Sequence, residues 1–201
     1  MENNRTYRMS FTAGGALKSE TLTVARLFWE LRDWNAVQEA VFRDNLLQLN
    51  TISSQRRLFS EVRGRLQALS EHELNLYINS SLQQQGYYTW LMLCRRYPFI
   101  GEFALSVIIP NFRSLEKLVT PSDYLRFWEG KLKERPELEK IAPTTQKKLR
   151  SGLFLFMRET GIINKSMEIC PIFISSELYK HLKTNAPDEL LFFPIAGTSG
   201  E

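Results

Sequence analysis

Apolar residues recur with helical spacing along almost the whole of this 201-residue chain. One run at i, i+3, i+4 and i+7 consists of Val24, Leu27, Phe28 and Leu31, and the stretch 87–94 repeats the same spacing. Residues placed in this way share one face of an α-helix, which packs its apolar side against other helices. The pattern therefore predicts an all-α protein.

Breaks and capping signals between these runs mark where the helices begin. Ser70 followed by Glu73 is typical of a capping box, and Thr120 before Pro121 is typical of a helix start. Counting such breaks predicts a compact helical globule of about eight or nine helices. The apolar residues around Pro171, at 169–174, predict at most a minor extended wing.

The length of the chain is sufficient to bury one sizeable core. Hydrophobic residues make up 43% and charged residues 24% of the sequence, which are ordinary values for a globular protein. We therefore expect one globular unit over residues 1–201, either undivided or built of two helical subdomains (about 1–118 and 119–195), with a flexible tail at 196–201.

Two short segments of the chain have almost the same sequence. Ser-Ser-Gln-Arg-Arg-Leu at 53–58 is matched 91 residues later by Thr-Thr-Gln-Lys-Lys-Leu at 144–149. A hydroxyl side chain can cap a helix, and the free N–H groups and dipole of a helix N-terminus favour an anion. Arginine and lysine neutralise phosphates, and glutamine can reach a base edge. Nucleic acid is therefore the first partner to consider.

The charge of the chain is concentrated around these two segments. The net charge is only +4, yet residues 55–66 carry a local charge of +3 and residues 144–168 another +3. Such clusters are typical of proteins that bind polyanions, although a solvated helix face gives the same pattern. A helical wheel places a polar stripe opposite the apolar stripe of each helix. These polar stripes are Arg56, Ser60, Arg63 and Gln67 in one helix and Lys147, Ser151 and Arg158 in the other.

Each of these segments opens the second helix of an expected helix pair. The first pair is 35–48 with 53–69, and the second, joined by a longer connector, is 121–134 with 144–160. A DNA-binding helix-turn-helix presents the N-terminus of its second helix to the major groove. We therefore expect two helix-turn-helix-like pairs that contact DNA mainly at phosphates. The candidate DNA-binding residues are Ser53, Ser54, Gln55, Arg56, Arg57, Arg63, Thr144, Thr145, Lys147, Lys148, Arg150, Ser151, Arg158 and Lys165.

The sequence carries no signature of catalysis. His72 and His181 neighbour no nucleophile motif, and with Cys94 and Cys170 they lack the close ligand pairs of a zinc site. Walker A and dinucleotide-binding motifs are also missing. We therefore expect a protein that is not an enzyme and that needs neither cofactor nor metal. The sparse cysteines fit a reducing cytoplasm, and no apolar stretch is long enough for a membrane span or a secretory signal.

Short blocks of residues form an ordered series along nearly the whole chain. They include Ser10-Phe11-Thr12-Ala13-Gly14-Gly15, Trp90-Leu91-x-x-Cys94-Arg95-x-Tyr97 and Arg158-Glu159-x-Gly161. This series resembles the BrxA family of bacterial BREX phage-defence systems. The resemblance implies a cytoplasmic accessory protein, helical like the antitermination factor NusB, that binds double-stranded DNA beside other BREX components. The chain departs from the family pattern at Gln55 and Thr145-Gln146, so the resemblance assigns neither glutamine a base-reading role.

Two other functions stay open at this point. The basic faces could dock on acidic surfaces of a partner protein, which would make the chain an interaction scaffold of the defence complex. The likeness to NusB suggests structured RNA as another partner. Arg57 and Arg150 could also be internal salt-bridge partners. We expect a monomer in isolation that does not contact membranes. One duplex can engage both basic helices only if these helices share a surface.

Overall fold

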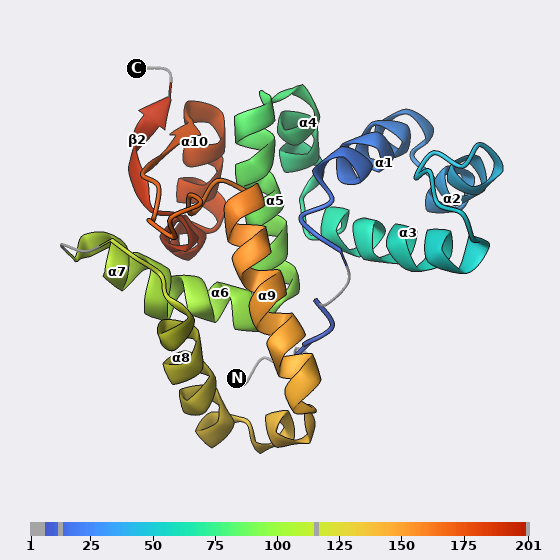
Figure 1. The fold of residues 1–201 in the computed structure, drawn as a ribbon. Helices are drawn as coiled ribbons and strands as arrows, with labels where there is room; N and C mark the ends of the chain where they lie inside the picture. Colours follow the sequence, from blue (N-terminus) through green and yellow to red (C-terminus); the bar gives the residue numbers. More distant parts are fainter. Residues whose placement is uncertain (1–6, 12–13, 115–116, 200–201) are drawn as a thin grey trace.

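The computed structural model describes residues 7–11, 14–114 and 117–199, and it confirms the predicted all-α class (Figure 1). No helix within these ranges is long and apolar enough to cross a membrane. The described α-helices are α1 (Lys18–Leu31), α2 (Trp34–Arg43), α3 (Ile52–Leu66), α4 (Glu71–Asn79), α5 (Leu82–Arg96), α6 (Pro98–Phe103), α7 (Ile109–Arg113), α8 (Pro121–Glu134), α9 (Pro143–Glu159) and α10 (Ser176–Asn185). Shorter elements are a π-helical turn (Ala104–Ile108), two 3-10 helices (Pro136–Lys140 and Pro187–Phe192) and strands β1 (Ile172–Ser175) and β2 (Ile195–Ser199).

Helix α5 runs through the centre of the molecule (Figure 1). Every residue from Gln84 to Cys94 is buried, so this helix is covered on all sides and not only along one stripe. It packs against α3, α4, α6 and α9. Trp90 is fully buried, and its indole N–H donates to the Phe192 carbonyl oxygen (2.9 Å). The aromatic residues of α5 therefore belong to the core.

Helices α1, α2 and α3 pack on one another and form a lobe beside the central helix (Figure 1). Asp33 caps α2 by accepting two backbone N–H groups of its first turn. Within the lobe, the rings of Phe28 and Trp34 stack with centroids 4.1 Å apart, and Phe59 meets Trp34 edge-on at 6.4 Å. This aromatic core fixes α3 at the side of the molecule.

A second aromatic cluster joins α6 to α8. The Phe99 ring lies 5.0 Å from Phe127 and 5.7 Å from Trp128, measured between ring centroids. Helix α8 begins as the sequence predicts, with Thr120 as its N-cap and a capping box completed by Asp123. The cluster therefore holds the helix that leads into α9.

The helical run from 98 to 113 continues past Pro110, although proline usually ends or kinks a helix. The π-helical turn at Ala104–Ile108 ends two residues before this proline. Its wider spacing is seen where the Ile109 N–H donates to the Ala104 carbonyl, five residues back. Because proline has no N–H and its ring clashes with a carbonyl of the preceding turn, the wider turn lets the helix absorb Pro110.

Strands β1 and β2 form a two-stranded parallel sheet. The Gln84 side chain closes the other edge of β1, because its amide donates to the Phe173 carbonyl (2.7 Å) and accepts the Ser175 N–H (3.0 Å). The expected extended wing at 169–174 overlaps β1. Residues 196–199, which the sequence predicts to be part of a flexible tail, instead lie in β2. Residues 200 and 201 of that tail lie outside the described residues.

The segment before α1 joins α3 to α9. The guanidinium of Arg65, fully buried near the end of α3, pairs with Glu61 (2.8 Å) and donates to the Ala16 carbonyl (2.7 Å). The carboxylate of Glu159, at the end of α9, accepts the Ala16 N–H. We call Ala16, Arg65 and Glu159 the Ala16 clamp. It holds the C-terminal ends of both basic helices on the backbone of one residue.

Candidate nucleic-acid interface

Helix α3 begins one residue earlier than the sequence predicts. Thr51 is its N-cap, and the Thr51 hydroxyl accepts the Ser54 N–H (3.2 Å). Ser53 and Ser54 therefore lie in the first turn, and the prediction that they cap the helix is wrong. Ser53 is exposed, whereas Ser54 is half-buried and its hydroxyl accepts a hydrogen bond from that of Thr51 (2.9 Å). Of the two serines, Ser53 is the one that solvent reaches fully.

The buried position of Gln55 corrects its assignment to the interface. The side chain is 7% exposed, and its amide N–H₂ donates to the Asn45 side chain (2.9 Å) and to the Leu49 carbonyl (3.2 Å). These two bonds tie α3 to the connector that precedes it. Gln55 is therefore a structural residue of this loop, and its amide is not available to a base edge.

The arginines of α3 divide into free and paired groups. Arg56 and Arg57 are exposed, while Arg63 is half-buried with its guanidinium carbon 5.2 Å from the Trp34 ring centroid. Within the described residues none of the three takes part in an ion pair. Arg65, which contributes to the local charge of the sequence, is instead buried in the Ala16 clamp. The free positive charge of α3 thus comes from three arginines.

Helix α9 begins at Pro143, with Ala142 in the N-cap position and no side-chain cap. Proline is suited to the first position because its missing N–H would have no partner inside the helix. Thr144 is exposed and Thr145 half-buried in the first turn, so the prediction that they cap α9 is wrong. The Gln146 amide donates to the Ile141 carbonyl (2.9 Å) and thus serves the local loop.

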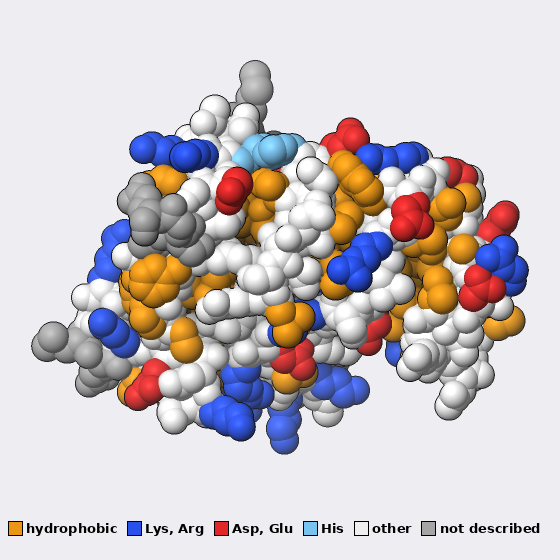
Figure 2. Space-filling view, turned by 90° about the horizontal axis from the view of Figure 1, so that it is seen from above, with side chains coloured by type: hydrophobic (Ala, Val, Ile, Leu, Met, Phe, Trp, Pro, Cys, Tyr) orange, Lys and Arg blue, Asp and Glu red, His pale blue; other side chains and the backbone are white. Residues whose placement is uncertain are grey.

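The cations of α9 line its polar side. Lys147, Lys148 and Arg158 are exposed, as is Ser151, and Arg150 is half-buried. Lys165 is exposed in the turns that follow the helix. Helix α9 lies at the front of the molecule in Figure 1. This front side forms the lower edge of Figure 2, where Lys and Arg side chains are gathered.

Ion pairing separates the candidate cations from the structural ones. Arg95 pairs with Glu73 (2.7 Å) and Glu189 (2.6 Å), and Lys131 pairs with Glu102 (2.9 Å). By contrast, no ion pair within the described ranges involves the predicted contact cations Arg56, Arg57, Arg63, Lys147, Lys148, Arg150, Arg158 and Lys165. Their charge is therefore uncompensated by neighbouring carboxylates. Arg57 and Arg150 are not the internal salt-bridge partners that the sequence left open.

The two basic helices approach each other at their C-terminal ends. The Arg65 guanidinium lies 5.4 Å from the Phe156 ring centroid, and the Ala16 clamp joins the helix ends. From this joint the helices run toward different corners of the molecule (Figure 1). At a rise of about 1.5 Å per residue, Arg56 lies about 14 Å along α3 from Arg65, and Lys147 about 18 Å along α9 from Glu159.

The connections within the two expected helix pairs are longer than usual for a DNA-binding helix-turn-helix. Residues 44–51 separate α2 from α3, and a 3-10 helix (Pro136–Lys140) lies between α8 and α9. The typical motif has a turn of about three or four residues. The pairs are consecutive helices in the expected order, with connections longer than that of the motif.

The BrxA family model matches residues 5–186, nearly the whole chain. The chain belongs to the BrxA family. A crystal structure of an uncharacterized protein from Magnetospirillum magneticum has a similar fold, with a TM-score of 0.81 over 95% of this chain and 99% of that one. At 19% sequence identity this likeness concerns the fold alone. Among curated proteins no match to the chain was found.

BrxA membership associates the protein with BREX phage defence. The BrxA family is not a known family of enzymes. Within the described ranges no three His, Cys, Asp or Glu side chains converge on a possible metal site.

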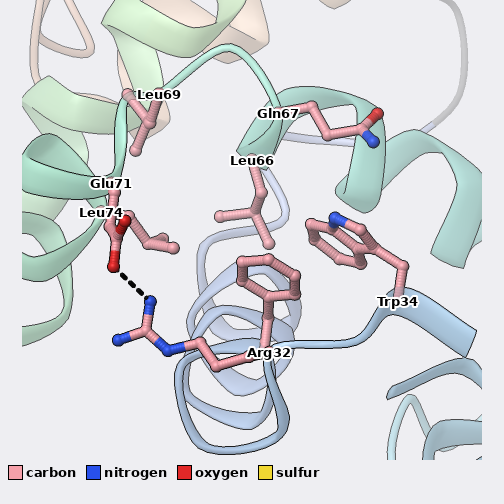
Figure 3. A pocket seen from close by; sticks show the side chains of 8 residues that line it. Arg32, Trp34, Leu66, Gln67, Leu69, Glu71 and Leu74 are labelled. Carbon is pink, nitrogen blue, oxygen red and sulfur yellow. Dashed lines mark hydrogen bonds and ion pairs between the residues drawn. The ribbon is translucent and has the colours of Figure 1, made fainter. Parts of the chain in front are cut away.

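A pocket of about 730 Å³ is a feature that the sequence does not reveal. It lies where α1, the start of α2, the end of α3 and α4 meet (Figure 3). The lining residues are Phe28, Arg32, Trp34, Leu66, Gln67, Leu69, Glu71 and Leu74. Because four helices and the segments between them supply these residues, no local pattern of the sequence shows that they share a pocket.

Proposed function

We propose that this BrxA protein is a non-catalytic, double-stranded-DNA-binding accessory component of a BREX system that contacts mainly phosphates through α3 and α9. The observation that supports the proposal most is the absence of ion pairs, within the described residues, at the eight predicted contact cations. Uncompensated surface cations release counterions from DNA when they approach phosphates, and this release supplies sequence-independent affinity. The burial of Gln55 also fits binding through phosphates, because its amide is then not used to read a base.

The start of α9 adds a second favourable feature. Pro143 has no N–H, and the Thr145 and Gln146 N–H groups donate to the Ala142 carbonyl (2.9 and 3.0 Å), so the first turn offers an anion the N–H of Thr144. Lys147 and Lys148 are exposed in the next turn. The α3 terminus differs, since the Thr51 side chain caps it. We therefore infer that both helices contribute chiefly charge to DNA and that α9 adds the N–H of Thr144.

A salt titration of binding to a duplex tests the proposal. Fluorescence anisotropy with a labelled duplex should show log K falling linearly with log salt, by about 0.9 per phosphate contact. The charge reversals R56E/R57E and K147E/K148E should each lower the affinity and flatten this slope by about 1.8. The control K180E/K183E changes the net charge equally at exposed lysines of α10 and should leave the slope nearly unchanged.

Two results would contradict the proposal. One is binding to DNA that does not depend on salt, and the other is equal losses for the control and for the two interface variants. Competition by duplex RNA of the same length separates DNA from structured RNA as the partner. Both cysteines, Cys94 and Cys170, are free, which fits action in a reducing cytoplasm beside other BREX components.

A further inference from the structure

We propose that the pocket between α1, α3 and α4 accepts an unpaired nucleobase of DNA that lies along α3. This inference rests on the proposed DNA binding, and it means that the protein would prefer DNA that contains an unpaired base. It begins from the polar stripe Arg56, Ser60, Arg63 and Gln67, whose members share one face of α3. Gln67 ends the stripe and lines the pocket, so a backbone that follows the arginines is led to the opening.

Arg63 places a positive charge close to the pocket. Arg63 takes part in no ion pair among the described residues, and its guanidinium carbon lies 5.2 Å from the ring centroid of Trp34, a lining residue. Arg56 and Gln67 are about 16 Å apart along the helix, a distance that a few nucleotides can cover. The continuity between this stripe and the pocket favours nucleic acid over a protein side chain as the occupant.

The walls of the pocket suit a planar ring. Phe28 is backed by Trp34, with ring centroids 4.1 Å apart and an interplanar angle of 18°. Leu66, Leu69 and Leu74 supply aliphatic surface. Bases stack on aromatic side chains whatever their identity, and a volume of about 730 Å³ lies within the usual range of ligand pockets.

Polar groups at the rim match the edges of a base. Arg32 donates to the Glu71 carboxylate (2.7 Å), and Figure 3 shows this pair on one side of the pocket and Gln67 on the other. A carboxylate accepts from an exocyclic amino group, arginine donates to carbonyl or ring acceptors, and glutamine can do both. Because Arg32 and Glu71 are 44% and 74% exposed, exchanging one partner for a base leaves no buried charge unpaired.

Three duplexes of equal length test the proposal by fluorescence anisotropy: one fully paired, one with a single bulged adenine, and one with an abasic bulge. We expect the natural protein to bind the adenine bulge about tenfold more tightly than the other two. The variant F28L should lose this preference. The control F42L should keep it, because Phe42 is a half-buried aromatic residue of the same lobe that packs on Phe59 and does not line the pocket.

The exposed rim residue provides a second variant without risk to folding. Q67A should reduce the preference for the adenine bulge about threefold while affinity for the paired duplex stays unchanged. Equal affinity for adenine and abasic bulges, or equal losses in F28L and F42L, would overturn the pocket proposal. Salt-dependent binding to the paired duplex would then still uphold the proposed function. If there is no bulge preference and F28L releases a purified BREX component, the pocket docks protein and the nucleobase proposal is wrong.

Discussion

Replacing Arg65 by methionine should remove the charge of the Ala16 clamp while keeping most of its apolar volume. The guanidinium is fully buried and pairs with Glu61 at 2.8 Å. Taking one member out of a buried pair typically costs about 3–5 kcal/mol. Glu61 keeps the Tyr97 hydroxyl (2.6 Å) and Arg96 (3.4 Å), so we expect the lower end, about 3 kcal/mol of unfolding free energy.

The pH dependence of this loss follows from the titration of Glu61. Burial by itself raises the pKa of Glu61. The Arg65 charge and the hydrogen bond from Tyr97 lower this pKa by more than burial raises it, so the pKa in the folded state lies below its usual range. Ionised Glu61 therefore stabilises the fold above the pKa of the unfolded chain, and this contribution is lost as the pH falls through the folded pKa. The stability difference between natural protein and R65M should shrink below about pH 4.

Urea denaturation followed by circular dichroism measures the effect. A loss of about 3 kcal/mol corresponds to a melting temperature lower by about 6–12 °C in a chain of this size. The control R56M removes an exposed, unpaired arginine from the same helix and should change stability by less than about 0.5 kcal/mol. If R65M were no more destabilising than R56M, or if its loss did not diminish at acid pH, the role assigned to the buried pair would be wrong.

Three further predictions concern the helix ends and the two basic helices. Gly161→Ala should cost about 1–2 kcal/mol because Gly161, after α9, has a φ of +82°, and Gly161→Asn should cost less; equal losses in urea denaturation would contradict this reason. Ser70→Ala removes the capping box of α4 and should cost about 1 kcal/mol in the same assay, with an unchanged midpoint as the contrary result. The slope of log K on log salt should be steeper for a duplex of about 20 base pairs than for a hairpin stem of about 6, which is too short to reach both helices, and equal slopes would mean that one helix alone binds.

Local signals in the sequence were sufficient for the helices and several of their starts. The capping boxes at Ser70 and Thr120 lie where the sequence predicts them, because each depends on residues within one turn. The same local logic misplaced the caps of the two basic helices. Thr51 caps α3 ahead of the two serines, and α9 starts at Pro143 without a side-chain cap, so the hydroxyl residues predicted as caps lie two or three positions after the true N-cap positions.

Long-range partners explain what the sequence could not predict. Arg65 looks like its exposed neighbours in the sequence, and only the folded chain brings Ala16 beside it. Gln55 looks polar and accessible until Asn45 supplies its partner in a preceding loop. Strand β2 pairs with β1, although α10 and a 3-10 helix separate the two strands in the chain. Such contacts depend on tertiary packing, which overrides the local pattern.

The joint between α3 and α9 relates the stability of the fold to its proposed interface. Arg56 and Lys147 lie about 14 Å and 18 Å along their helices from Arg65 and Glu159 of the Ala16 clamp, so the two helix arms together measure about 32 Å. One turn of DNA spans about 34 Å, so the two cationic helix ends can contact phosphates that lie about one helical turn apart on the same duplex. The angle at the joint then sets which separation is reached. The clamp is shared by both helices, because Arg65 is buried and paired with Glu61 while Glu159 accepts the Ala16 N–H, and it fixes that angle better than the exposed helix ends could by themselves.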